Sequence, residues 1–242
     1  MITPEWPAPR RVRAAFTVRT GGVSLAPYDS LNVGAGIGDS AAAVAENRRR
    51  VRETLGLPGE PVWLEQVHGV GVVELGTGHA GGDASVTRGV GQVCAIRVAD
   101  CMPVLFAARD GSVVGAAHAG WRGLAGGVLE ATMGRLGVPA SELIAWMGPA
   151  IGPKHFEVGE DVRAAFMAAD VGAASAFVAS ARGRWQCDLY ALARRRLSGL
   201  GVSGIYGGGW CTFSQADRFF SYRRDGQCGR MAALIWIEPG QD

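Results

Sequence analysis

The chain has 242 residues, of which 48% are hydrophobic and 19% charged, so a disordered protein is excluded and a sizeable core is expected. The formal net charge of +2 gives no indication of a nucleic-acid or anionic-membrane partner, and no run approaches the ~18 apolar residues of a membrane span. Residues 1–13 contain three prolines and no apolar segment of the kind found in signal peptides. None of the five cysteines form a CxxC pair, so we expect reduced thiols and a cytoplasmic location.

The order of predicted elements favours one mixed domain. Alternating residues predict a strand over residues 12–19, which runs into a glycine loop at 20–24. A helix is predicted over 41–55, because Asp39 or Ser40 can cap its start and Gly56 and Pro58 stop it. Short apolar runs at 62–67 and 70–75 precede a glycine-rich loop at 77–84. Further strands are predicted at 93–99, 103–108, 112–117, 143–147, 205–206, 219–223 and 231–237, and further helices at 121–136, 161–169 and 188–200. Without a linker or a clear repeat, we expect a single α/β (α+β) domain over residues 1–242.

Three metal-ligating side chains lie at predicted ends of core elements. His68, Cys101 and His118 each stand next to or near glycine or proline, at positions that are rigidly held and can face a cleft. Two imidazoles and one thiolate suit zinc, and three protein ligands leave the fourth position open, as a catalytic zinc requires. Because the three residues are widely separated and fit no local zinc motif, two core histidines and a buried thiol remain an alternative.

The same residues allow other functions. Cys101 and His118 are a candidate nucleophile–base pair for hydrolysis, with Asp100 or another carboxylate orienting the imidazole. Adding Met102 imitates the ligands of blue copper, although neighbouring side chains in an extended segment point to opposite faces. A zinc-stabilised binding module without catalysis is a further alternative, with Cys94 as the nearest spare ligand. His79 and His155 are expected to be solvated or structural.

Several basic and glycine residues are candidates for substrate binding. The Gly21-Gly22 loop follows a strand beside Arg19, and glycine lets backbone amides approach an anion closely. Arg48, in a run of three arginines, and Arg122, in a Gly-Trp-Arg-Gly turn, are candidate phosphate ligands. Asp83, in a loop next to Gly82, is expected to bind a substrate hydroxyl or to cap a turn.

A set of short motifs stands in the order seen in one family. They are Arg19-x-Gly21-Gly22-Val23-Ser24, Ser30-Leu31-Asn32, Glu46-Asn47-Arg48, Gln66-Val67-His68-Gly69, Ala99-Asp100-Cys101-Met102-Pro103, His118-Ala119-Gly120-Trp121-Arg122-Gly123 and Phe220-Ser221-Tyr222-Arg223-Arg224-Asp225. Over nearly its whole length the chain resembles the laccase-domain family, formerly described as multicopper polyphenol oxidases and now as purine nucleoside phosphorylases. The resemblance implies a layered fold of mixed sheets and flanking helices, similar in its cysteine–histidine core to a bacterial toxin deamidase.

The resemblance also implies a function. It places Zn²⁺, with Cu²⁺ as the alternative, at His68, Cys101 and His118. It implies phosphorolysis of adenosine, inosine, guanosine or methylthioadenosine to the base and the sugar 1-phosphate, with adenosine deamination as a side activity. Removal of wrongly built cell-wall precursors, by a Cys/His hydrolase, and copper-dependent polyphenol oxidation are the alternatives. The expected partners are a purine nucleoside and phosphate. We expect Arg48 and the Gly21-Gly22 loop to position the phosphate, and Asn32 to aid the contacts to ribose or phosphate. The expected state is a monomer or a homodimer.

Overall fold

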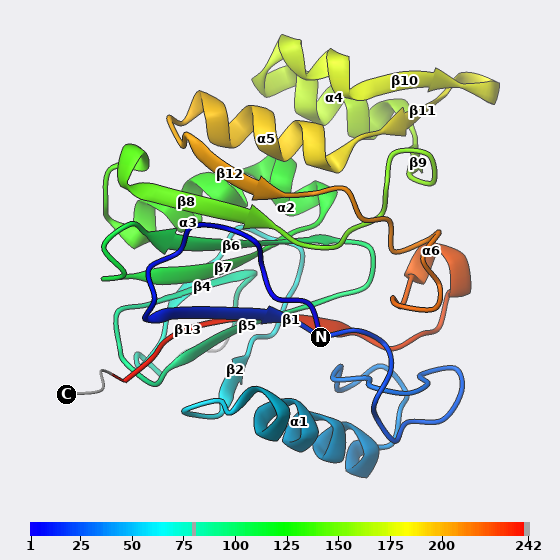
Figure 1. The fold of residues 1–242 in the computed structure, drawn as a ribbon. Helices are drawn as coiled ribbons and strands as arrows, with labels where there is room; N and C mark the ends of the chain where they lie inside the picture. The colour runs from blue at the N-terminus through cyan, green and yellow to red at the C-terminus, as the bar shows by residue number, and fades with distance from the viewer. Residues whose placement is uncertain (79–80, 240–242) are drawn as a thin grey trace.

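Two β-sheets stacked face to face form the centre of the molecule (Figure 1). The computed structural model describes residues 1–78 and 81–239, so His79 lies outside the described residues. The four-stranded sheet has the order β1-β13-β5-β2, with β1 Val12–Phe16, β13 Met231–Ile237, β5 Val93–Val98 and β2 Pro61–Trp63. The six-stranded sheet has the order β12-β8-β6-β7-β4-β3, with β12 Gly204–Gly207, β8 Leu143–Met147, β6 Met102–Ala108, β7 Val114–Ala119, β4 Ala84–Thr87 and β3 Val72–Glu74. These sheets confirm the predicted mixed α/β class.

Strict alternation along β13 divides the core into layers. Ala233, Ile235 and Ile237 belong to the apolar cluster between the two sheets, while Leu234 and Trp236 belong to the cluster beneath the four-stranded sheet. Both sets are buried because successive side chains of a strand point to opposite faces. A strand with apolar residues on both faces is therefore covered on both sides, which places β13 in the middle of the molecule.

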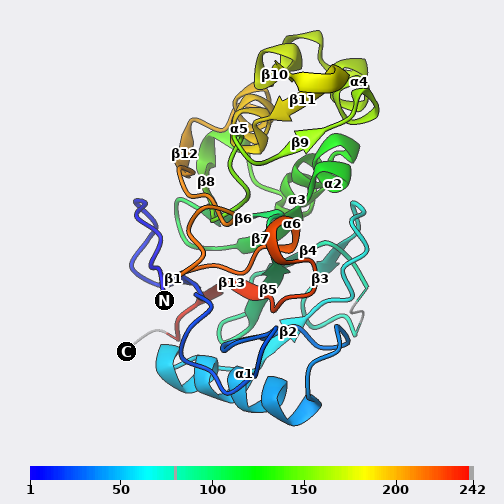
Figure 2. The same ribbon diagram turned by 90° about the vertical axis from the view of Figure 1, so that its right-hand side faces the viewer.

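Helices cover the outer faces of both sheets (Figure 2). Helix α1, Ala41–Leu55, lies against the four-stranded sheet, and its observed bounds confirm the prediction. On the other side of the molecule, α2 Trp121–Gly126 and α3 Val128–Leu136 pack on the six-stranded sheet. Beyond them lie α4 Glu160–Ala169, α5 Leu189–Gly199 and a three-stranded sheet of β9 Glu157–Val158, β11 Arg184–Cys187 and β10 Phe177–Ser180. Short 3-10 turns occur at Ala140–Glu142, Val171–Ala176 and Ala181–Gly183.

Two predicted elements were wrong. The single helix expected over residues 121–136 is interrupted at Gly127, whose φ of 98° lies in the left-handed region that ends helices. The strand expected over 219–223 is a loop that enters α6, Tyr222–Asp225, because the Ser221 hydroxyl caps the Arg224 amide. Phe219 and Phe220 are both buried although they are consecutive, so their apolar character reflects anchoring of this loop and not a strand face.

A pair of glycine substitutions tests the interruption between α2 and α3. We expect Gly127→Ala to lower the free energy of unfolding by about 1–2 kcal/mol, since an L side chain is strained in the left-handed region. Gly134→Ala, within α3, meets no atom within 4 Å and should raise that free energy by up to about 1 kcal/mol. Urea unfolding of both variants measures the two effects, and a neutral Gly127→Ala would contradict the first.

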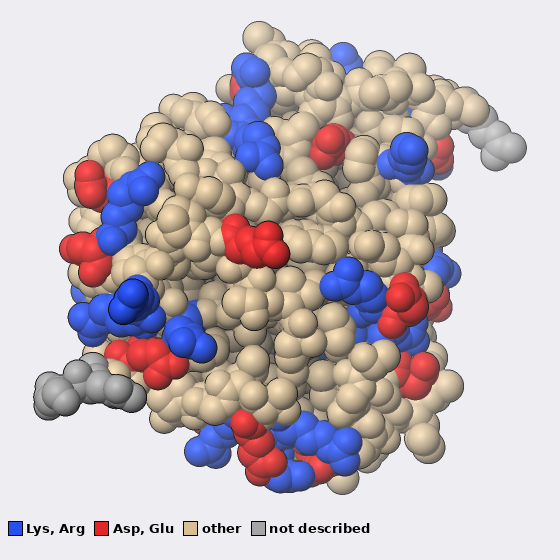
Figure 3. Space-filling view, in the orientation of Figure 1, with Lys and Arg blue, Asp and Glu red and all other residues tan. Residues whose placement is uncertain are grey.

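Charged side chains of both signs are interspersed over the face drawn in Figure 3, in keeping with a formal net charge of +2. Within the part of the chain that the structure describes, every helix is too short or too polar to traverse a lipid bilayer.

Candidate metal centre

The three predicted metal ligands meet where strands of both sheets end. His118 is near the end of β7, and Cys101 directly precedes β6, which pairs antiparallel with β7 and so begins at the same edge. His68 follows β2 of the other sheet, in a loop that reaches this edge. The ligand atoms of the three residues lie within 4.8 Å of one another, and Cys101 Sγ is 3.8 Å from His68 Nε2. Among the described residues, this is the one histidine, cysteine and acidic cluster with metal-ligating geometry.

Asp83 holds two of the ligands in place. It precedes β4, which pairs antiparallel with β7, so its fully buried carboxylate lies beside His118 and accepts a hydrogen bond from Nδ1 at 2.8 Å. The same carboxylate accepts hydrogen bonds from the amides of Val67, His68 and Gly69 at 3.1, 2.9 and 2.6 Å. These contacts stabilise the left-handed backbone of His68, whose φ is 62°. Of the two roles expected for Asp83, the three amide bonds correspond to capping of the turn at residues 67–69, and the bond from His118 adds the orientation of a metal ligand.

Charges and hydrogen bonds within the cluster shift the pKa values of Cys101 and His118 in opposite directions. Burial opposes ionisation of Cys101, but the charge and hydrogen bonds of His118 and His68 outweigh it and lower the pKa of Cys101. Burial likewise opposes a charge on His118, yet Cys101 and Asp83 outweigh it and raise the pKa of His118. Desolvation also acts on Asp83, where the hydrogen bonds from His118 and Gly69 prevail and lower the pKa. The lowered pKa favours the thiolate of Cys101, which is the form that ligates metals and acts as a nucleophile.

The donor set and its surroundings fit a zinc ion. Because Nδ1 of His118 donates to Asp83, Nε2 is left to coordinate, the arrangement in which a carboxylate orients a metal-bound imidazole. Tetrahedral zinc bonds imply about 3.5 Å between sulfur and nitrogen ligands, close to the 3.8 Å observed between Cys101 and His68. Gly120, which precedes α2, leaves space beside them, since a Cβ there would lie 2.9 Å from Cys101 Sγ and 3.2 Å from His68 Cδ2.

A cavity of about 610 Å³ opens onto the cluster. Its wall includes the three ligands, the apolar side chains of Ile151, Phe156 and Tyr222, and the arginines Arg97, Arg223 and Arg230. Neither Arg97 nor Arg230 was expected at the site from the sequence. A signal existed for Arg97, because it interrupts the otherwise apolar strand that leads to Cys101.

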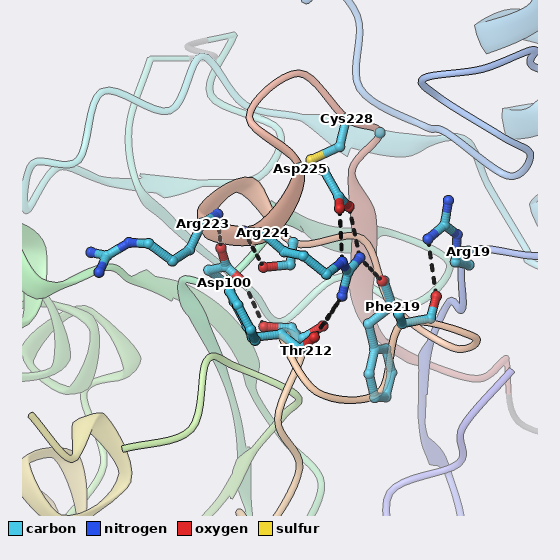
Figure 4. A network of polar contacts seen from close by, with 12 residues as sticks. Arg19, Asp100, Thr212, Phe219, Arg223, Arg224, Asp225 and Cys228 are labelled. Carbon is cyan, nitrogen blue, oxygen red and sulfur yellow. Dashed lines mark hydrogen bonds and ion pairs between the residues drawn. The ribbon is translucent and has the colours of Figure 1, made fainter. Parts of the chain in front are cut away.

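Asp100 has a structural role next to Cys101 (Figure 4). Its carboxylate accepts hydrogen bonds from the Thr212 hydroxyl at 2.6 Å and from the Arg223 amide at 2.7 Å. These bonds dock the segment containing α6 against the start of β6, despite a strained φ of 83° at Asp100. The carboxylate that orients His118 is therefore Asp83, and the orienting role considered for Asp100 was wrong.

The glycine loop and Arg19 form contacts within the chain. The Gly22 amide donates to the Ser30 hydroxyl at 3.1 Å, and the Gly21 carbonyl accepts from Arg50 at 3.3 Å. Arg19 forms an ion pair with Asp29 at 3.2 Å and donates to the Ala216 carbonyl. None of these predicted anion-binding residues lines the cavity beside the metal ligands.

Three other predicted substrate residues also lie outside the cavity wall. Asn32 is fully buried and accepts hydrogen bonds from the amides of Gly34 and Arg230, so it supports that wall from behind. Arg48 lies 4.3 Å from the Trp63 ring and lines a separate hollow. Arg122 lies 4.4 Å from its neighbouring Trp121 ring, in a depression that shares Phe156 and Arg223 with the cavity.

Comparison with known proteins confirms the resemblance found in the motifs. The chain is 56% identical over 239 residues to "Purine nucleoside phosphorylase PA4543" of Pseudomonas aeruginosa, and 51% identical over 240 residues to "Purine nucleoside phosphorylase YfiH" of Escherichia coli, covering 98% of each pair of chains. The crystal structure of Neisseria meningitidis protein NMB0706 superposes with a TM-score of 0.94 at 49% identity, covering 98% of this chain and 99% of that one. YlmD from Geobacillus stearothermophilus gives 0.86 at 32% identity, covering 95% and 93%. Since residues 13–238 match the model of the multi-copper polyphenol oxidoreductase laccase family, the chain belongs to that family.

Proposed function

We propose that this chain is a zinc-dependent purine nucleoside phosphorylase that accepts adenosine, inosine, guanosine or methylthioadenosine. The observation that carries the proposal is the cluster of His68, Cys101 and His118 on the wall of a cavity of about 610 Å³, a size suited to a small ligand. The names of two relatives that share about half of the sequence support the same class of reaction.

In this reaction, an oxygen of phosphate bonds to C1′ of the ribose while the bond from C1′ to N9 of the purine breaks. The electron pair of the broken bond stays on the purine, which takes up the proton carried by hydrogen phosphate, and the sugar leaves as ribose 1-phosphate. Positive charge develops on the sugar ring, as in other glycosidic cleavages. The site must therefore orient two reactants and keep bulk water from replacing phosphate.

The chain's own residues divide these tasks. A zinc ion held by His68, Cys101 and His118 would supply a Lewis acid that polarises an oxygen of the substrate. Asp83 keeps His118 in the tautomer that presents Nε2 to the ion. Ile151 and Phe156, 1% and 8% exposed, form an apolar wall that packs against a purine ring and excludes water.

The placement of Met102 supports zinc over copper. Met102 is fully buried in the cluster on the helix side of the six-stranded sheet, whereas Cys101 packs against the cluster between the sheets. Its thioether thus faces away from the imidazoles and does not complete the ligand set of a blue-copper centre.

A cysteine hydrolase acting on cell-wall precursors is a second candidate. Cys101, His118 and Asp83 favour it because they resemble a nucleophile–base–carboxylate triad. The pKa of the Cys101 thiol is lowered, and the Asp83 carboxylate orients the His118 imidazole. Such a hydrolase needs no metal, so removing metal separates the two functions. Adenosine deamination remains a proposed side activity of the zinc form.

The decisive experiment combines metal removal with product analysis. The protein is purified without added copper, its metal is identified by mass spectrometry, and base release from inosine and adenosine is followed with and without phosphate. We expect about one zinc per chain, ribose 1-phosphate as the sugar product, and loss of activity on treatment with a chelator that zinc restores. Formation of inosine from adenosine in the same assay would show deamination.

Other outcomes decide against the proposal. Base release that does not depend on phosphate would make the protein a hydrolase of nucleosides. Activity that survives complete metal removal would favour the cysteine hydrolase, and copper-dependent oxidation of a polyphenol without base release would favour the oxidase.

A further inference from the structure

Three arginines on the cavity wall lack a carboxylate partner. Arg97, Arg223 and Arg230 line the cavity with the metal ligands, and none forms an ion pair with a described acidic residue. The acidic residue on that wall, Asp100, already accepts hydrogen bonds from Thr212 and the Arg223 amide. Three guanidinium groups therefore share this wall with one carboxylate, and the cavity carries an excess of positive charge.

Strand pairing places two of these arginines side by side. Arg97 of β5 is opposite Ala232 of β13, and Arg230 precedes Ala232 by two residues, so both side chains leave the same face of the sheet. Arg97 is four residues before Cys101, so this pair lies at the edge where the metal ligands gather. Burial, followed by the positive charge of Arg230, lowers the pKa of Arg97, in keeping with this placement.

Backbone carbonyls fix the two guanidinium groups without neutralising them. Arg97 Nη2 donates to the Leu64 carbonyl at 2.8 Å, while its buried Nε has no hydrogen-bond partner. Arg230 Nη1 donates to the carbonyls of Cys228 and Gly229 at 2.7 and 3.1 Å. Both guanidinium groups are thus held on the cavity wall by neutral acceptors, which leave their positive charges for a bound anion.

We propose that Arg97 and Arg230 form the subsite for the phosphate dianion, beside the metal centre, with Arg223 at its open side. This inference rests on the proposed phosphorolysis. A dianion between two fixed guanidinium groups removes their mutual repulsion and supplies acceptors for their remaining N–H groups. Arg223 is exposed, and Figure 4 shows its side chain extending away from the paired Arg224 and Asp225. The subsite takes the role that sequence reasoning gave to Arg48 and the Gly21-Gly22 loop.

Phosphate binding is measured first, apart from catalysis. Inorganic phosphate is titrated into the zinc-loaded protein, and the melting temperature is followed against chloride of equal ionic strength. We expect phosphate to stabilise the native chain and to lose this effect in Arg230→Gln and Arg97→Gln. Arg109→Gln is the matched control, because Arg109 is exposed, donates to the Ser141 carbonyl and lies outside the cavity wall. Arg97→Lys keeps the charge and tests the same position if Arg97→Gln fails to fold.

Steady-state kinetics of the arginine variants then show whether the substitutions affect phosphate binding or nucleoside binding. We expect the KM for phosphate to rise roughly 10- to 100-fold in Arg230→Gln, as for the loss of one hydrogen-bonded charge, while the KM for inosine changes less than about twofold. Inosine 5′-monophosphate is tested in parallel, since its phosphate has the same chemistry from another source. Protection by this nucleotide but not by inorganic phosphate would overturn the assignment to the co-substrate.

The outcomes separate this inference from the proposed function. Phosphorolysis with an unchanged KM for phosphate in both arginine variants would overturn the subsite and leave the phosphorylase standing. Phosphate protection that the two variants abolish, in a protein that releases no base, would support the anion site and refute the phosphorylase. Equal loss of protection in Arg109→Gln would show a general charge effect and would also overturn the subsite.

Discussion

Replacing Cys101 with alanine is expected to remove the metal and the base-releasing activity while the protein stays folded. Cys101 is partly exposed at the edge of the inter-sheet cluster, and its thiol bonds to the imidazoles of His118 and, at 3.8 Å, His68, so truncation leaves little unsatisfied outside the metal cluster. Loss of a residue that only orients a ligand lowers metal affinity by about 10- to 100-fold, and loss of a ligand itself should exceed this. We therefore expect at least a ~100-fold fall in both zinc affinity and turnover.

Metal analysis, inosine phosphorolysis and thermal melting of the same preparation check this result. Cys211→Ala is the matched control, because Cys211 is also partly exposed and accepts a hydrogen bond from the Gly152 amide, but does not belong to the cluster. Full zinc occupancy in Cys101→Ala would refute the ligand assignment. An unfolded Cys101→Ala chain, with a folded Cys211→Ala chain, would instead support a zinc-stabilised binding module.

Asp83→Asn should weaken metal binding and stability together. The carboxylate accepts hydrogen bonds from three backbone amides and from His118. In asparagine, an NH₂ group replaces one of the two accepting oxygens, so some of these four donors would face another donor. We expect a ~10- to 100-fold loss of zinc affinity, as for other residues that orient a metal-bound imidazole. The free energy of unfolding should fall by about 2–4 kcal/mol, because the variant leaves buried donors unpaired.

Chelator competition measures the affinity, and urea unfolding of the metal-free protein measures the stability. The absorption spectrum of the Co²⁺-substituted protein adds a reading of ligand geometry that a stability defect elsewhere does not alter. Asp39→Asn serves as the control, since Asp39 accepts hydrogen bonds from Ser24 and Asn32 outside the metal cluster. An unchanged Co²⁺ spectrum and zinc affinity in Asp83→Asn would exclude a positioning role for Asp83.

The contrast between Asp83 and Asp100 shows why sequence spacing could not assign the orienting carboxylate. Asp100 is adjacent to Cys101 in the sequence, yet its side chain binds Thr212 and the Arg223 amide, more than 100 residues away. Asp83 is 35 residues from His118 and meets it because β4 and β7 pair antiparallel with Ala84 opposite Ala117. Strand register, which adjacency along the chain does not specify, decided between the two carboxylates.

Local signals were sufficient where an element depends on its own residues. Helix α1 has its predicted bounds because Ser40 caps its start and Gly56 ends it in the left-handed conformation. The order of motifs also sufficed to identify the family, and the same motifs named the three side chains that the structure brings within 4.8 Å. By itself, then, the sequence determined the family, the mixed class of fold and the identity of the candidate metal ligands.

Only the tertiary structure decided which arginines face those ligands. Arg19, Arg48 and Arg122 stand in recognisable motifs, yet their guanidinium groups contact Asp29, Trp63 and Trp121. Arg97 and Arg230 are 133 positions apart and become neighbours through the pairing of β5 with β13. The physical reason is that a cavity is made of residues from several strands, and its charge depends on which ion pairs the folded chain completes and which it leaves open.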